Sequence, residues 1–277
     1  MRKTPFWRLF DAILQDKLKT EMCRKSDLVI MKMIEAYDPY TGGFKIGGGL
    51  YKITRDDVAN IFGITDGADK VVLQQGSREA VRMVNRGLVV KERLTSKTSK
   101  VMTREYATRM EEEYIMVVVH LLCAYLLHSL FFAAGTTVKW VRLERAEDLN
   151  RINSYDWCSA ILDDLMTSIN KRHNEPSKVS GCVLILLYWL CEHTNLVTPL
   201  NPNEQLGIIK WRTIDLAKHL ERTTLDKLDP DQVIGTKDTG CSVSDNGGNV
   251  EGVIPSGDEK VSHHETNSDH EMNVQQP

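Results

Sequence analysis

The sequence predicts a mostly α-helical protein: a single helical domain over residues 1–228 with a small β-hairpin, followed by a disordered acidic tail over residues 229–277. Three observations predict this class. Apolar residues recur at helical spacing in several segments, two long apolar runs are typical of core helices, and the composition changes near residue 229. The chain has 277 residues, 42% hydrophobic and 26% charged, which is enough to bury one sizeable core.

The first predicted helices are amphipathic. In PFWRLFDAILQDKL, one helix face is shared by Phe6, Leu9, Phe10, Ile13 and Leu14, and DLVIMKMIEAY shows the same spacing. In YDPYTGGFKIGGGLYKIT, Pro and Gly separate two short alternating runs, FKI and LYKI. These runs predict the hairpin.

The segment TRDDVANIFG carries the signals of a short helix. Thr54 is a good N-cap with Asp57 three residues later, as in a capping box, while Ile53 and Val58 are spaced as a hydrophobic staple. Gly63 is placed to end the helix in a left-handed conformation. The glycines at 47–49 precede this helix with a strand between, a spacing that fits neither a Walker nor a Rossmann loop. They therefore predict a turn rather than a phosphate site.

The most hydrophobic stretch, residues 114–138, has no formal charge for 25 residues and is long enough to be a transmembrane candidate. It contains His120 and His128, and it follows three glutamates. The second apolar run, CVLILLYWLC, is too short to span a bilayer. We therefore expect two buried core helices and no membrane span.

Two later segments are also predicted to be helical. SYDWCSAILDDLMTSI reads as an amphipathic helix capped by Ser154 or Asp156, and Pro176 is expected to open the next helix, filled by residues 183–189. LGIIKWRTIDLAKHLERTTL follows as a last amphipathic segment. The ordered body is expected to end near Leu228.

The acidic tail differs from the rest of the chain in charge and hydrophobicity. Residues 229–277 hold ten Asp and Glu against two Lys, whereas the other 228 residues hold 33 Lys and Arg against 28 Asp and Glu. After residue 236 there is no aromatic residue and no long apolar run, so the tail cannot bury enough surface to order itself. Its histidines, His263, His264 and His270, are expected to be solvated rather than to hold a metal.

Six cysteines are scattered without a C-x-x-C pair, and the first twenty residues do not read as a signal peptide. This pattern favours reduced thiols in the cytosol or nucleus. The nearest approach to a metal-ligand group is Cys182, Cys191 and His193, but they lie in an apolar helix pattern. We expect buried thiols there, with no metal and no cofactor.

A basic run is the candidate functional site. Residues 70–109 contain ten basic and three acidic residues, a pattern that suits nucleic-acid phosphate or an acidic partner. Arg78, Arg82 and Arg86 would share one face of the predicted helix SREAVRMVNRG, and Lys91 and Arg93 continue the run. Few aromatic residues accompany it, so an ordinary solvated face is the alternative.

Three motifs occur in sequence over roughly residues 40–195: KITRDDVANIFGITDG, AYLLHSLFFAAGTTV and SYDWCSAILDDLMTSI. In them the chain resembles the plant mobile domain ("aminotransferase-like") family of transposon-derived plant proteins. It resembles equally the related plant-specific domain that precedes SUMO-protease-like modules in transposable elements.

The resemblance implies a helical nuclear module of transposable-element origin, with no catalytic residues to carry over. A pyridoxal phosphate enzyme would need a Schiff-base lysine and a phosphate cup, and neither is legible. A thiol peptidase would need Cys, His and Asp or Asn in one folded unit, but Cys123, Cys182 and Cys191 lie in apolar helices and Cys241 lies in the tail.

We therefore expect a non-enzymatic interaction module, nuclear or nucleocytoplasmic, with protein partners and with nucleic acid as a candidate ligand. The alternative is the N-terminal portion of a SUMO-protease-like (cysteine peptidase) transposon protein that lacks its catalytic domain.

Overall fold

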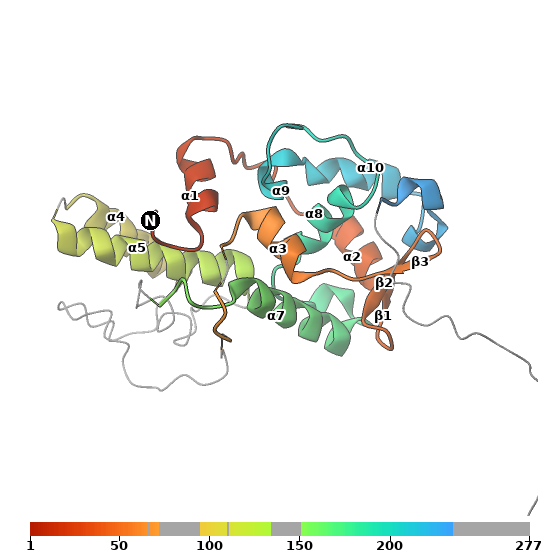
Figure 1. The fold of residues 1–277 in the computed structure, drawn as a ribbon, viewed down its shortest axis with the longest axis horizontal. Helices are drawn as coiled ribbons and strands as arrows, with labels where there is room; N and C mark the ends of the chain where they lie inside the picture. The colour runs from red at the N-terminus through yellow and green to blue at the C-terminus, as the bar shows by residue number, and fades with distance from the viewer. Residues whose placement is uncertain (66, 72–94, 110, 134–150, 235–277) are drawn as a thin grey trace, which may run out of the picture. The chain divides into compact units, whose positions relative to one another are not determined.

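Helices form most of the chain that the computed structural model describes, which comprises residues 1–65, 67–71, 95–109, 111–133 and 151–234. All of these residues belong to one structural unit, Met1–Asp238. The elements in chain order (Figure 1) are α1 (Trp7–Leu14), α2 (Asp27–Glu35), β1 (Tyr37–Asp38), β2 (Gly43–Ile46), β3 (Gly49–Tyr51), α3 (Arg55–Phe62), α4 (Ser96–Ala107), α5 (Glu112–Leu126), the π-helix η1 (Leu127–Phe131), α7 (Trp157–Arg172), the 3-10 turn η2 (Pro176–Lys178), α8 (Leu184–Glu192), α9 (Gly207–Lys210), the 3-10 turn η3 (Thr213–Asp215), α10 (Leu216–Leu220), and the 3-10 turns η4 (Leu225–Lys227) and η5 (Pro230–Gln232). The predicted mostly-α class is confirmed.

The predicted hairpin is confirmed as strands β2 and β3. Ile46 pairs with Gly49, which leaves Gly47 and Gly48 as a two-residue turn. Both turn residues have positive φ, 54° and 73°, the geometry that favours glycine in tight hairpins. The sequence did not predict β1, which pairs antiparallel with β2 and makes the sheet three-stranded.

Helix α3 begins and ends as its sequence predicts. The Thr54 side chain accepts a hydrogen bond from the Asp57 N–H, and the Asp57 side chain accepts one from the Thr54 N–H, so the capping box is complete. Gly63 ends the helix with φ of 65°. Ile53 and Val58, the predicted staple pair, are both buried.

The core is built around α8, whose residues from Leu184 to Cys191 are all buried. It packs against α2, α3, α9 and η3. An aromatic cluster joins further elements to this core. The centroid of the Phe131 ring lies 5.1 Å from that of Phe62 and 5.6 Å from that of Phe6, and the Phe6 and Trp157 centroids lie 5.8 Å apart. One cluster thus ties the N-terminal segment to α3, η1 and α7.

Helices α4 and α5 lie side by side (Figure 1). The apolar stretch from Tyr114 to Phe131 is 18 residues long and hydrophobic enough to cross a bilayer on length and composition, and 44% of it is buried in the structure. A core helix of a soluble protein passes the same test. The expectation of a core helix therefore stays a prediction.

Three helical predictions differ from the structure. Ile13 and Leu14 are exposed at the end of α1, where Ala12 takes the buried position. Pro176 opens only the turn η2, and α8 starts separately at Leu184. The predicted last amphipathic segment is not one continuous helix but is divided into α9, η3 and α10, because Trp211 is extended and its indole N–H donates to Glu192 Oε1 at 2.6 Å.

The described body continues past Leu228, where we expected order to end. Val233 forms an isolated bridge with Thr194, and the Ile234 N–H donates to the His193 carbonyl. The predicted acidic tail from residue 235 onward lies outside the described residues, as does the predicted helix SREAVRMVNRG.

Gly63 and Gly48 offer a matched test of the α3 terminus, because both have positive φ. A Cβ on Gly63 would collide with the Leu206 side chain and lie 2.9 Å from Arg8 Cβ, whereas Gly48 has open space. We expect Gly48→Ala to lower the free energy of unfolding by about 1–2 kcal/mol through backbone strain alone. Gly63→Ala should cost about 1–3 kcal/mol more through overpacking. Urea unfolding measures both, and equal losses would contradict the collision.

Candidate functional site

The candidate residues chosen from sequence, Arg78, Arg82, Arg86, Lys91 and Arg93, all fall within 72–94 and lie outside the described residues. Their arrangement stays a prediction. The downstream part of the same basic run is described, because residues 96–107 form α4.

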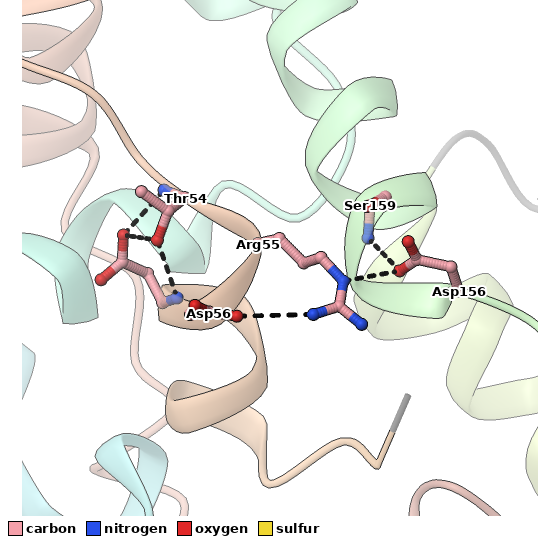
Figure 2. A network of polar contacts seen from close by, with 6 residues as sticks. Thr54, Arg55, Asp56, Asp156 and Ser159 are labelled. Carbon is pink, nitrogen blue, oxygen red and sulfur yellow. Dashed lines mark hydrogen bonds and ion pairs between the residues drawn. The ribbon is translucent and has the colours of Figure 1, made fainter. Parts of the chain in front are cut away.

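A polar network surrounds the start of α3 (Figure 2). The Asp57 N–H donates to Thr54 Oγ1 at 3.2 Å, and Asp57 Oδ2 accepts from the Thr54 N–H and hydroxyl, both at 2.7 Å. The other carboxylate oxygen, Oδ1, lies 2.9 Å from His193 Nε2. Because a carboxylate only accepts, the His193 nitrogen is the donor.

Asp57 therefore joins the first turn of α3 to the residue that follows α8. Burial raises the pKa of its carboxyl, but the hydrogen bonds from His193 and Thr54 outweigh burial and lower the pKa overall. The His193 ring also stacks on Trp189, with centroids 4.7 Å apart. The Asp57–His193 hydrogen bond therefore joins the start of α3 to the end of α8, and the Trp189 ring packs against the histidine that makes it.

Arg55 links the N-terminus of α3 to that of α7 (Figure 2). Its Nε donates to Asp156 Oδ1 at 3.3 Å, and its Nη1 lies 3.4 Å from Asp56 Oδ1. Asp156 is the N-cap of α7 and also accepts from the Ser159 N–H at 3.0 Å, so the second of the two predicted caps is the one used. Burial raises the pKa of Asp156, and the bonds from Ser159 and Arg55 lower it further than burial raises it.

This network is suited to structure rather than to chemistry. Both oxygens of Asp57 are engaged by neighbours within the fold.

The thiols of Cys123 and Cys182 are buried, and burial raises the pKa of each to about 12, so both stay protonated and weakly nucleophilic. Within the described ranges, no group of three or more His, Cys, Asp or Glu is placed to hold a metal. The predicted ligand candidates Cys182, Cys191 and His193 form no such group among the described residues, and the His193 ring is hydrogen-bonded to Asp57.

Surface hollows occur elsewhere on the described body. One, of about 370 Å³, is lined by Lys32, Lys45, Tyr37 and their neighbours. Lys32 Nζ donates to the Thr223 carbonyl at 2.7 Å, and Lys45 Nζ lies 3.2 Å from Asp38. Both lysines thus have partners within the fold.

Helix α4 carries a row of cations on its outward side. Lys97, Lys100 and Arg104 follow each other at spacings of three and four residues, and all are exposed. None of the three pairs with a carboxylate in the part of the chain that the structure describes. Ser99 is buried, and Tyr106 near the C-terminal end of α4 is half-buried and stacks on Tyr114 of α5.

Tyrosines accompany this row. The Tyr106 and Tyr114 rings stack 5.5 Å apart, and the Arg109 guanidinium lies 4.8 Å from the Tyr114 centroid. Lys100 Nζ lies 5.4 Å from the Tyr125 centroid. Few aromatic residues accompany the basic run in the sequence itself, because Tyr114 and Tyr125 lie further along the chain, in α5. We call this surface the α4/α5 cationic face, made of Lys97, Lys100, Arg104, Arg109, Tyr106, Tyr114 and Tyr125.

Carboxylates limit the face at one end. Glu105 lies 3.6 Å from Arg109, and Glu111 and Glu112 are exposed at the start of α5. The uncompensated positive charge is therefore concentrated on Lys97, Lys100 and Arg104.

A family model described as a domain of unknown function, DUF8566, matches residues 10–187. The chain belongs to the DUF8566 family. The match begins within α1 and ends within α8, and it includes both helix starts of the polar network and the whole α4/α5 cationic face. No curated protein and no solved structure matches the chain.

Asp57 and Asp56 form a matched pair for testing the network. The Asp57 side chain is 17% exposed and accepts three hydrogen bonds, whereas Asp56 is 81% exposed and pairs with Arg55. Asp57→Ala should lower the free energy of unfolding by about 1–3 kcal/mol because partners lose their acceptor. Asp56→Ala should change it by no more than about 0.5 kcal/mol. Chemical denaturation of both variants measures these free energies of unfolding. An Asp57→Ala variant as stable as the wild type would show that the contacts are weak.

Acid should weaken the same network. The pKa values of Asp57 and Asp156 are lower in the folded chain than the usual 3.8. Their contribution to stability is therefore full above pH 3.8 and is lost as pH falls through the lowered folded values. Urea midpoints measured across this acid range should fall more steeply for the wild type than for an Asp57→Asn, Asp156→Asn double variant. Parallel profiles would contradict the assignment.

Proposed function

We propose that this DUF8566 domain is a non-enzymatic helical interaction module that contacts nucleic acid through the α4/α5 cationic face. The observation that carries the proposal is the exposed row of Lys97, Lys100 and Arg104, in which Lys100 lies over the Tyr125 ring. Helical spacing presents the three cations along one side, where they can meet successive backbone phosphates.

The tyrosines add a second kind of contact. Base stacking on aromatic rings tolerates any sequence, since every base has a π-face, and cations beside the rings strengthen it. Tyr106, Tyr114 and Tyr125 are half-buried, so each is held in place while part of it reaches the surface. This combination favours single strands over duplex.

A transposable-element origin and a nuclear location belong to the same proposal. They are supported by the three motifs that resemble the plant mobile domain family. Two of these motifs contribute α3 and α7, whose starts are joined by the Arg55–Asp156 contact.

The proposal is tested by measuring binding of fluorescent single-stranded DNA, duplex DNA and RNA to the full chain by anisotropy. Over about 50–500 mM NaCl, affinity should fall with salt, because phosphate contacts release counterions. The triple variant Lys97→Ala, Lys100→Ala, Arg104→Ala should reduce the slope of log K against log salt by up to roughly 2–3.

A matched control removes three other exposed lysines. Lys45, Lys178 and Lys218 each lie beside a carboxylate partner within the fold. Their replacement by Ala changes the net charge equally but should leave the salt slope close to that of the wild type. Absence of binding at low salt, or equal losses in the two triple variants, would refute the proposed interface.

A further inference from the structure

The outward side of α4 carries opposite charges at equal distances from one apolar residue. Lys97 lies four residues before Val101, and Glu105 lies four residues after it. Residues four apart lie one above the other on a helix, so the three share one side, with steps of about 6 Å along the axis. All three are exposed, Val101 by 56%. This side of α4 therefore has a positive end, an apolar middle and a negative end.

Neither charged end is held by a strong contact within the fold. Lys97 has no ion-pair partner in the part of the chain that the structure describes. Glu105 lies 3.6 Å from Arg109, and the two side chains are 57% and 46% exposed. Exposed pairs of this kind contribute little stability, so Glu105 can exchange this partner for another.

A surface with this order of charges is complementary to a copy of itself. When two α4 helices lie antiparallel about a two-fold axis at Val101, Lys97 is level with Glu105 of the second copy. Because such an interface is isologous, the same contact forms twice. A parallel pair would instead place like charges together, which is unfavourable. A single exposed valine is ordinary on a protein surface, so the order of the charges is what selects the partner.

The other two cations of the row are compatible with this arrangement. Lys100 Nζ lies 5.4 Å from the centroid of the Tyr125 ring, so this lysine is directed towards α5. Arg104, three residues after Val101, is level with the uncharged Thr98 of the second copy. Neither Lys100 nor Arg104 is therefore level with a cation of the second copy.

We propose that two copies of this chain associate through antiparallel α4 helices, with Lys97 of each copy beside Glu105 of the other and the two Val101 side chains in contact. One 12-residue helix from each copy makes a smaller interface than a stable dimer has. The association is therefore weak and needs a high chain concentration. It does not rest on the proposed function, because the contact involves no nucleic acid.

Sedimentation equilibrium of the full chain, freed of nucleic acid, measures this association. Between about 10 and 500 μM at low salt, the wild type should shift from monomer to dimer. About 0.5 M NaCl should weaken the association, because the ion pairs are exposed. Lys97→Glu alone and Glu105→Lys alone should each weaken it several-fold, because like charges then face each other. A wild type that stays monomeric over the whole range would overturn the proposal.

An equal mixture of the two variants is the sharpest form of the test. Each chain then presents two like charges to two opposite charges on the other chain, so mixed dimers should form with about the wild-type affinity. A mixture that stays monomeric would overturn the pairing of Lys97 with Glu105. Single variants that associate as strongly as the wild type would overturn it too.

Lys178→Glu and Glu175→Lys are matched controls, because these two residues form an exposed ion pair elsewhere on the chain. Both controls should associate like the wild type. Equal losses in the controls and in the α4 variants would show an effect of net charge and would overturn the proposal. Val101→Ser should weaken the association about 3- to 10-fold through the lost apolar contact. An unchanged association would refute a two-fold axis at Val101.

The pairing and the proposed function can fail separately. If the chain binds single-stranded DNA but neither the wild type nor the mixture forms dimers, the proposed function stands and the pairing is wrong. If the wild type and the mixture form dimers but no nucleic acid binds at low salt, the pairing stands and the proposed function is wrong.

Discussion

Helix α8 has no polar face, and this constraint organises the rest of the fold. Every residue from Leu184 to Cys191 is buried, so the helix must be covered around its whole circumference. Helices α2, α3 and α9 and the turn η3 supply that cover. Removing one large side chain from such a site typically costs about 2–5 kcal/mol. These four elements are therefore placed where they cover the apolar surface of α8.

Polar side chains at the end of α8 make directional contacts that select which neighbours meet. Glu192 accepts from Lys210 Nζ and the Trp211 indole, while His193 donates to Asp57. Apolar packing alone tolerates sliding, whereas these directional contacts fix the position of each neighbour. The polar network therefore fixes how the helices are aligned in the core. The exposed cations on α4 are not part of this network.

Local signals were predictable from sequence and distant ones were not. Thr54, Asp57 and Gly63 act within one short helix, so their roles could be predicted from spacing alone. The break at Trp211 depends on Glu192, and the Asp57–His193 contact joins residues far apart in the chain. The aromatic part of the α4/α5 cationic face was not predictable for the same reason, since Tyr125 meets Lys100 only after the two helices pair.

The turn at Gly47 lies against the last described residues. Its N–H donates to the Leu225 carbonyl at 2.9 Å, and a Cβ there would come within 2.9 Å of Val233. Val233 in turn bridges to Thr194, beside the end of α8. These contacts join an early hairpin to residues that leave the ribosome much later. During synthesis the hairpin must therefore wait, with one side uncovered, until the segment from Leu225 to Ile234 emerges and closes over it.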